Sequence, residues 1–247
     1  MIYILLPAFN EYPNLVKILK QVERSYFLKK KTFVVLVDDT STDTTYKFKN
    51  YKNANFKFKY IKNKKNLGLS LTLEKGFSYI IKISRPEDII VTLDADNTHP
   101  IETIQRMIKK LKKNDVIVAS RFVSGSKVYG LSVFRKILSL AARIVFTISF
   151  PIKNIRDYTC NFRAYKSIYI KNLIEKNQNF FVSKDFGIAA DILIQLNLMD
   201  KSIKFNEVSF TLYYNRKIGE SKIKIFKTIY LTLKIIFKNV FQNKIRK

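Results

Sequence analysis

Acidic side chains follow apolar runs at three places in this chain of 247 residues. Glu11 follows the first run, Asp38 and Asp39 follow the second, and Asp94 and Asp96 follow a later one. Carboxylates gathered at one edge of a sheet repel one another unless a cation or hydrogen-bond donors join them. The Asp-Ala-Asp spacing puts two carboxylates on the same side of an extended segment, which suits a hard divalent ion that also binds a diphosphate. The pattern therefore predicts a site for Mg²⁺ or Mn²⁺ and a phosphorylated substrate.

Three other residues of reactive type have simpler interpretations. Asp43, in the segment Ser-Thr-Asp-Thr, is explained as well by a helix cap or turn as by a role in the site. His99, the single histidine, lies just after the Asp-Ala-Asp motif, where we expect it to support the site, although a role as a general base is the alternative. Cys160, the single cysteine, cannot form an internal disulfide and is expected to be a small packed residue and not a nucleophile.

Strand-like and helix-like segments alternate in the first half of the chain. We predict strands at 3–6, 33–37, 56–61, 89–93 and 116–119, and helices at roughly 12–24, 42–50, 69–84 and 100–112. This alternation favours an α/β fold with a mostly parallel central sheet and helices on both faces. Ligands of such sheets bind beyond the carboxyl ends of the strands, where the acidic residues stand.

The second half of the chain is less regular. We interpret 1–215 as one catalytic domain and 216–247 as a C-terminal appendage. Within the domain, 131–152 is an apolar stretch interrupted by three basic residues, and 183–197 is predicted to be a helix. The apolar residues of 131–152 recur at helical spacing, which would suit a helix lying at a membrane interface: Phe134, Ile137, Leu138, Ala141 and Ile144.

The C-terminal segment is predicted to contain a basic amphipathic helix from about 222 to 241. At about 100° per residue, lysines gather on one side and aliphatic residues on the other. The lysines are Lys224, Lys227, Lys234 and Lys238, and the aliphatic residues are Ile225, Ile229, Leu233, Ile236 and Val240. Such a helix is typical of segments that lie in the plane of an anionic membrane surface. The alternative is a helix that packs its apolar face on the domain.

The formal net charge of +27 implies an anionic partner, although part of it could be compositional drift. A nucleic-acid-binding protein would interleave exposed aromatic residues with lysine, whereas most aromatic residues here fall inside strands or on apolar helix faces. No signal peptide is visible, and no run free of charged residues is long enough to cross a bilayer. We therefore expect a peripheral protein on the cytoplasmic face of a membrane, with a membrane-anchoring partner protein as a further option.

Four motifs follow one another along the chain: Leu6–Glu11 with Asn14–Leu15, then Val37–Asp43, Asn66–Gly68 and Leu93–Pro100. In this order they resemble glycosyltransferase family 2. Three later segments resemble the dolichol-phosphate mannose synthase group of that family: Ser120–Phe122, Arg156–Tyr165 and Arg216–Lys222. The resemblance covers roughly residues 2–225. The chain departs from the family at Thr40, where Gly is usual, and at Cys160-Asn161, where Ser-Gly is usual. Because Asn tolerates positive φ, Asn161 is expected to be a mild change.

The resemblance implies a GT-A fold and a set of site residues. By it, the donor nucleotide is bound by Pro7, Phe9, Glu11, Asp38, Asp39 and Asp94. The metal is held by Asp94 and Asp96, with Thr98 at the position of the third side-chain ligand. Phosphates of donor and acceptor are held by Arg121, Arg135, Arg216, Ser221 and Lys222. The residues expected to take part in catalysis are Asp94, Asp96, Arg121 and Arg135.

The resemblance also implies an inverting enzyme that moves mannose from GDP-mannose to a polyprenyl phosphate. That chemistry is consistent with the residues, because a lipid phosphate is already a nucleophile and needs no general base. The site has only to neutralise the leaving diphosphate and align the substrates. A family 2 transferase acting on a glycan hydroxyl is the main alternative, and it would need a carboxylate base such as Asp185 or Asp191. A transferase-like fold without activity is disfavoured by the intact Asp94 and Asp96.

Overall fold

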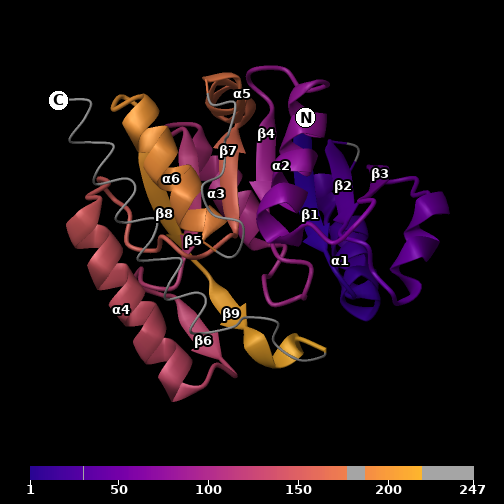
Figure 1. Ribbon diagram of the computed structural model, residues 1–247, viewed down its shortest axis with the longest axis horizontal. Helices are drawn as coiled ribbons and strands as arrows, with labels where there is room; N and C mark the ends of the chain where they lie inside the picture. Colours follow the sequence, from indigo (N-terminus) through magenta and orange to yellow (C-terminus); the bar gives the residue numbers. More distant parts are fainter. Residues whose placement is uncertain (30, 177–186, 219–247) are drawn as a thin grey trace.

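The computed structural model describes residues 1–29, 31–176 and 187–218 (Figure 1). Its centre is a seven-stranded sheet with the strand order β3-β2-β1-β4-β7-β5-β8. The strands are β1 (Ile2–Ala8), β2 (Thr32–Asp38), β3 (Lys57–Lys62), β4 (Ile89–Thr92), β5 (Val116–Ser120), β7 (Arg163–Lys166) and β8 (Phe205–Ser209). All neighbouring pairs are parallel except those of β7, which runs antiparallel to both β4 and β5. The predicted α/β fold with a mostly parallel sheet is therefore confirmed.

The central strands form because continuously apolar runs are buried on both faces of the sheet. Every residue of β1 and of β5 is buried, whereas the edge strand β3 alternates exposed lysines with partly buried residues. Lysines on an edge strand oppose pairing with another chain, because each added strand would desolvate their charges. The core thus lies around β1, β4 and β5, and the loops that follow these strands rest on a rigid base.

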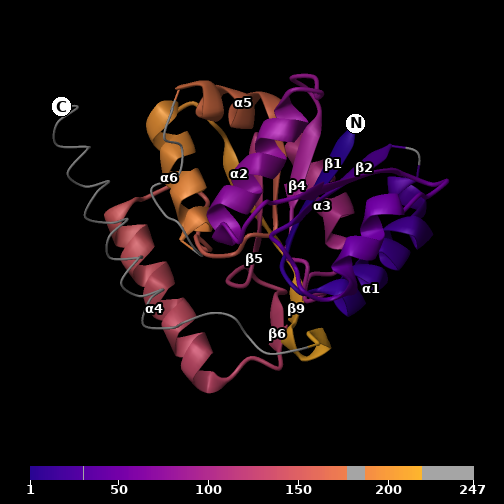
Figure 2. The same ribbon diagram turned by 45° about the vertical axis from the view of Figure 1, so that its right-hand side comes forward.

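Helices cover both faces of the sheet, as predicted, with α2 in front of it and α3 behind it in Figure 2. The α-helices are α1 (Tyr12–Arg24), α2 (Gly68–Ile81), α3 (Thr103–Leu111), α4 (Val133–Ser149), α5 (Ser167–Lys176) and α6 (Ile188–Met199). The 3₁₀ helices are η1 (Tyr26–Leu28), η2 (Thr44–Asn50) and η3 (Tyr214–Arg216). The segment predicted as a helix at 42–50 is η2, whose tighter turns begin at Asp43, where the carboxylate accepts a hydrogen bond from the amide of Thr45. Asp43 is thus a cap, the simpler of its two interpretations.

Helix α4 stands apart from the layered core, at the outer edge of the molecule in Figures 1 and 2. Next to it, β6 (Lys127–Tyr129) and β9 (Thr211–Tyr213) form a small parallel sheet. The helix was predicted from the apolar spacing of 131–152, and it forms between Ser132, whose hydroxyl caps the amide of Arg135, and Phe150. Among the residues that the structure describes, no helix combines the length and the apolar character needed to cross a bilayer.

Two predicted helices lie partly or wholly outside the residues that the structure describes. The C-terminal helix expected at 222–241 lies outside the described residues, as does the first part of the helix expected at 183–197. The described part of the latter is α6. The boundary between a domain at 1–215 and an appendage at 216–247 stays a prediction.

Candidate active site

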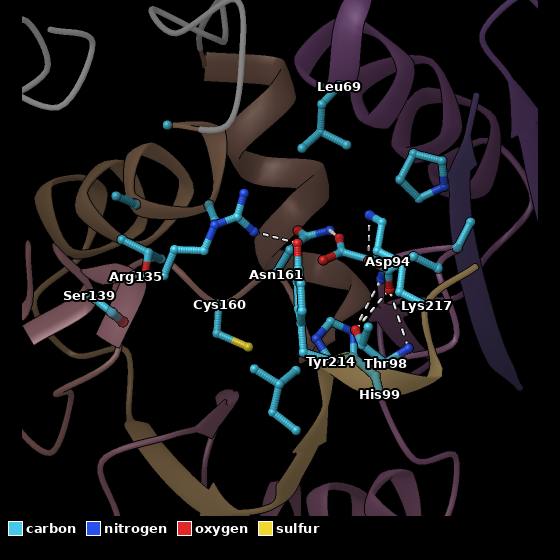
Figure 3. Close-up of a pocket in the computed structure, with 18 of the residues that line it drawn as sticks. Leu69, Asp94, Thr98, His99, Arg135, Ser139, Cys160, Asn161, Tyr214 and Lys217 are labelled. Carbon is cyan, nitrogen blue, oxygen red and sulfur yellow. Dashed lines mark hydrogen bonds and ion pairs between the residues drawn. The ribbon is translucent and has the colours of Figure 1, made fainter. Parts of the chain in front are cut away.

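A cavity of about 930 Å³ opens at the carboxyl ends of the strands, where the sequence placed the site. Two kinds of wall enclose it. One is polar and is formed by the loops after β1, β2 and β4, and the other is largely apolar and is formed by α4 with the start of α6. Figure 3 shows Asp94, Thr98 and Lys217 gathered on one side and Arg135 on another. The cavity therefore offers a charged end and an apolar end to its ligands.

Asp94 is oriented by two neighbours of the cavity wall. Its backbone amide donates to Nδ1 of His99 over 3.3 Å, and its Oδ1 accepts from the side-chain amide of Asn161 over 3.2 Å. Burial raises the pKa of Asp94, since a charged carboxylate loses water there. His99 itself is stacked on Phe162, with ring centroids 5.0 Å apart. The histidine thus supports the acidic motif, as predicted, and its ring does not stand free as a base.

Asp96 has a different set of partners. Its Oδ1 accepts from the amide of Thr98 over 3.2 Å and from the hydroxyl of Thr98 over 2.7 Å, and its Oδ2 lies 3.1 Å from the ammonium of Lys217. Burial alone would raise the pKa of Asp96, but the neighbouring His99 and Lys217 lower it. Asp96 is therefore held as a carboxylate that already attracts a cation. Thr98 positions Asp96 through its hydroxyl, and its role as a third metal ligand stays a prediction.

The carboxylates fit a hard divalent ion. Asp94 and Asp96 supply oxygen ligands, and the ammonium of Lys217 on Asp96 shows that this position accepts positive charge. Within 1–29, 31–176 and 187–218, no three residues of His, Cys, Asp or Glu converge into a ready-made metal centre. Two carboxylates completed by substrate phosphates and water are the usual arrangement for Mg²⁺, which seldom uses an all-protein cage. Asp94 and Asp96 would hold such an ion.

The wall nearest β1 and β2 contains four of the residues expected to bind the nucleotide, Pro7, Phe9, Glu11 and Asp39. Asp39 is fixed by three donors: the side-chain amide of Asn63 at 2.7 Å and the backbone amides of Leu67 and Gly68, each at 2.8 Å. Its carboxylate is therefore held in a fixed position at the edge of the cavity.

Asp38, expected beside Asp39 in the nucleotide site, does not line the cavity. It is fully buried, accepts from the amide of Ser41 over 2.8 Å and accepts from the hydroxyl of Tyr60. Burial, together with this carboxylate, raises the pKa of Tyr60. Successive side chains of an extended segment point to opposite sides, so only one of the two aspartates can face the ligand. Asp38 braces the loop instead.

The loop after β2 contains Thr40 at φ 65°, in the left-handed region where this family usually has glycine. A β-branched residue in that conformation is strained, and its hydroxyl donates to the carbonyl of Asn63 over 3.2 Å. Asn161, by contrast, does not have the positive φ expected of a residue that replaces glycine. Its side chain bonds Asp94, so the change from glycine adds a contact within the site.

Arg121 lines the cavity, but a buried carboxylate already holds its guanidinium. Nε and Nη2 donate to the two oxygens of Asp157 over 2.8 and 2.7 Å, and Nη2 also donates to the hydroxyl of Thr159. Burial by itself raises the pKa of Asp157, and Arg121 more than reverses this effect. Glu207 in turn accepts from the amide of Asp157 over 2.7 Å. Arg121 thus anchors the floor of the cavity, and any phosphate would be an additional ligand.

Arg135, on the inner face of α4, lines the cavity. Its guanidinium lies over the ring of Tyr214, and Nη1 donates to the Tyr214 hydroxyl.

Arg216 takes a different position from the one predicted. It is exposed, lies 3.6 Å from the ring centroid of Tyr213 and is not part of the cavity wall. The last turn of η3 directs Arg216 outward, and the next residue, Lys217, enters the site instead. Ser221 and Lys222 lie outside the described residues.

Lys217 is not among the predicted site residues, although it lies within the segment Arg216–Lys222 that resembles the family. Only its position after Arg216 could have signalled it, and a lysine in a chain so rich in lysine carries little information. Cys160 is buried and lines the cavity, and burial, with Asp157, raises its pKa to about 12. It is therefore a thiol at neutral pH and not a nucleophile, as predicted.

The comparison with protein families identifies the chain. The model of glycosyl transferase family 2 matches residues 3–178. The chain belongs to this family. Its fold agrees, since it superimposes with a TM-score of 0.67 on glucosyl-3-phosphoglycerate synthase from Mycobacterium tuberculosis, solved with Mn²⁺, UDP and phosphoglyceric acid. That match covers 97% of this chain and 78% of the other at 14% identity, and it shows the GT-A fold alone.

Two curated relatives within this family are similar over most of the chain. The dolichol-phosphate mannosyltransferase of Pyrococcus furiosus is 31% identical over 238 residues, which are 95% of this chain and 62% of that protein. The undecaprenyl-phosphate mannosyltransferase of Micrococcus luteus is 26% identical over 220 residues, which are 89% of this chain and 86% of that protein. The chain thus spans less than two thirds of the length of the Pyrococcus relative.

Proposed function

We propose that this chain is a metal-dependent glycosyltransferase that moves mannose from GDP-mannose to a polyprenyl phosphate at a membrane surface. The observation that carries the proposal is the two-ended cavity. Asp94 and Asp96 stand at its charged end, Arg135 stands at the border, and the inner face of α4 provides an apolar wall. A nucleotide diphosphate with its metal suits the first end, and a phosphate attached to a lipid chain suits the border and the wall. The names of the two relatives support this choice of substrates.

The chemistry that we propose needs no general base. An oxygen of the lipid phosphate bonds to C1 of the sugar while the bond from C1 to the diphosphate breaks, so the configuration at C1 inverts and the nucleoside diphosphate leaves. A divalent ion, when bound, stabilises the negative charge of that leaving group. Asp94 and Asp96 would hold the ion, which would in turn bind the diphosphate, while Asp39 and Glu11 position the nucleoside and Arg135 attracts the acceptor phosphate.

The alternative acceptor, a glycan hydroxyl, has less support from the described site. It requires a carboxylate within reach of the hydroxyl proton. Asp191 is fully buried in α6 and does not line the cavity, and Asp185 lies outside the described residues. An acceptor that is already ionised therefore agrees better with the side chains that face the cavity.

The membrane contact that we propose involves α4. Its outer face exposes a row of large apolar residues: Val133, Phe134, Ile137, Leu140, Ile144 and Ile148. Residues on the other side of the same helix, such as Ala142 and Phe146, line the cavity. A helix with water-exposed apolar side chains is stabilised by the boundary between lipid headgroups and acyl chains. At that depth the phosphate of a polyprenyl acceptor would meet Arg135, with the nucleotide sugar arriving from the cytoplasmic side.

The test is direct. The purified chain is incubated with Mg²⁺ or Mn²⁺, a short polyprenyl phosphate and each of several labelled nucleotide sugars, GDP-mannose, UDP-glucose and UDP-N-acetylglucosamine among them. Label from GDP-mannose should enter the lipid phase, and an Asp96→Ala variant should abolish the signal. Label that enters the lipid only from a UDP-sugar would correct the donor, and failure of every donor to label the lipid would overturn the acceptor.

A further inference from the structure

Lys217 is the one cation of the described chain that pairs with a carboxylate of the acidic motif. Its ammonium lies 3.1 Å from Oδ2 of Asp96, and the side chains of both residues are only 13% exposed. The ammonium of Lys217 thus stands where a divalent ion bound by Asp96 would have to stand.

The backbone around Lys217 is attached to both sides of the site. The amide of Tyr213 donates to the carbonyl of Thr98, two residues after Asp96, over 3.1 Å. Asn14 contacts the backbone of Ile218 through both ends of its side chain, at 3.2 and 3.4 Å, while the same Asn14 donates to Glu11 over 2.7 Å. The segment 213–218 thus extends from the metal motif to the wall of the nucleotide pocket, and Lys217, labelled in Figure 3, is its contact with Asp96.

We propose that Lys217 is a built-in competitor of the divalent ion for Asp96, so that metal and nucleotide bind only when the lysine leaves. Both cations need the same carboxylate oxygen, and two positive charges at that distance repel each other strongly in a partly buried site. When only a fraction of the molecules is free to bind, the apparent dissociation constant rises by the inverse of that fraction. Lys217 therefore lowers the affinity for the metal and links its binding to release of the segment 213–218. This inference rests on the proposed function, because it takes Asp96 as a metal ligand.

The experiment measures metal binding and not turnover. Mn²⁺ is titrated into the full chain with GDP present, and free Mn²⁺ is followed by electron paramagnetic resonance. Replacing Lys217 by a neutral residue of similar length, Lys217→Met, should tighten Mn²⁺ binding roughly ten-fold, since the competing ion pair is removed. Lys217→Gln should act in the same direction, and Lys217→Arg should keep the affinity near that of the wild type. Lys127→Met, which removes an exposed lysine on β6, is the control for loss of one positive charge and should change little.

The outcomes separate this inference from the proposed function. Equal Mn²⁺ affinity in the wild type and both neutral variants overturns the competition, and so does equal tightening in Lys127→Met. Weaker binding in the neutral variants also overturns it and would make Lys217 a ligand of the diphosphate. If neither the wild type nor any folded variant binds Mn²⁺ with GDP or UDP, the proposed function itself fails, whatever Lys217 does. Circular dichroism of each variant confirms that it is folded.

Discussion

At the scale of single residues, the two aspartates of the acidic motif have different tasks. Asp94 is held by Asn161 and by the ring of His99, whereas Asp96 is held by Thr98 and faces Lys217. None of these contacts belongs to the hydrophobic core. A change at Asp96 should therefore affect ligand binding far more than folding.

We expect Asp96→Ala to abolish sugar transfer while the protein stays folded. In the proposed mechanism this carboxylate binds the metal that holds the diphosphate, and its removal leaves only a small polar gap at the cavity wall. Transfer is measured with labelled donor, and folding by circular dichroism. Removal of metal from the wild type with EDTA should have the same effect. Full activity in EDTA, with no metal left in the preparation, would exclude metal dependence.

The two arginines of the cavity should respond differently to substitution. Arg135→Ala should lower the rate by about ten-fold to over a hundred-fold, the equivalent of roughly 1.5–3 kcal/mol for a charge-assisted contact, with little effect on melting. Arg135→Lys should restore only part of the rate, because an ammonium lacks the planar fork of donors. An unchanged rate in Arg135→Ala would show that this arginine is only a neighbour of Tyr214.

Arg121→Ala should, in contrast, destabilise the fold. Asp157 is fully buried, and without Arg121 it would be a buried charge that has lost its ion-pair partner, which costs roughly 3–5 kcal/mol. Chemical denaturation measures the loss. Arg121→Ala with wild-type stability would contradict the anchoring role of Arg121. Phosphate binding would then be the role expected of this residue.

At the scale of elements, the contact of α2 with β1 sets the position of the nucleotide wall. Gly76 of α2 lies against Leu5 of β1, and a Cβ at this position would come within 2.2 Å of Leu5 Cδ1 and 3.1 Å of its Cγ. The absence of a side chain lets the helix approach the strand closely. Glycine inside a helix is otherwise unfavourable, by about 1 kcal/mol relative to alanine.

Whether Gly76→Ala raises or lowers the free energy of unfolding depends on which of these two effects is larger. The gain in helix propensity is about 1 kcal/mol, whereas forcing a methyl group into a packed core costs typically 1–3 kcal/mol, and a separation of 2.2 Å lies at the severe end. We expect net destabilisation of about 1–2 kcal/mol, measured by urea denaturation. Leu5→Val shortens the opposing side chain. Adding Gly76→Ala to the Leu5→Val variant should therefore destabilise the protein less than adding it to the wild type. Strictly additive effects would show that Leu5 is not the obstacle.

At the scale of the whole molecule, apolar exposure and charge together favour a membrane surface. The outer face of α4 exposes apolar side chains to water, and the chain has a net charge of +27. Each lysine or arginine near an anionic leaflet contributes about 1 kcal/mol of attraction, which salt weakens. The segment 216–247, predicted to be basic and amphipathic, would act in the same direction.

Co-sedimentation with liposomes tests the role of α4. The variant Phe134→Gln, Ile137→Gln should bind vesicles containing anionic lipid several-fold more weakly than the wild type, because two side chains that are 57% and 59% exposed no longer enter the interface. Ile83→Gln, at an exposed position away from α4, is the matched control. A chain ending near Lys222 measures the separate contribution of the C-terminal segment. Binding that is unchanged in both the α4 variant and the shortened chain would exclude both helices as anchors.

Much of this protein follows from local sequence pattern. The apolar runs define the strands of the parallel sheet, and the carboxylates after these runs locate the site, because parallel strands end at one edge of the sheet. The helix at 131–152 likewise follows from its spacing of apolar residues, although the spacing does not tell which face meets the cavity and which meets the surroundings.

Tertiary structure decided the direction of individual side chains, since this depends on contacts between distant segments. Asp39 faces the cavity and Asp38 faces Tyr60, Lys217 enters the site where Arg216 was expected, and Arg121 is paired with Asp157. Adjacent residues such as Arg216 and Lys217 have the same charge and similar length, so sequence cannot rank them. The turn of η3 separates their roles: Lys217 pairs with the carboxylate of Asp96, and Arg216 lies over the ring of Tyr213. The sequence by itself therefore determined the fold and the edge of the sheet at which the candidate site lies, and packing decided which charges meet there.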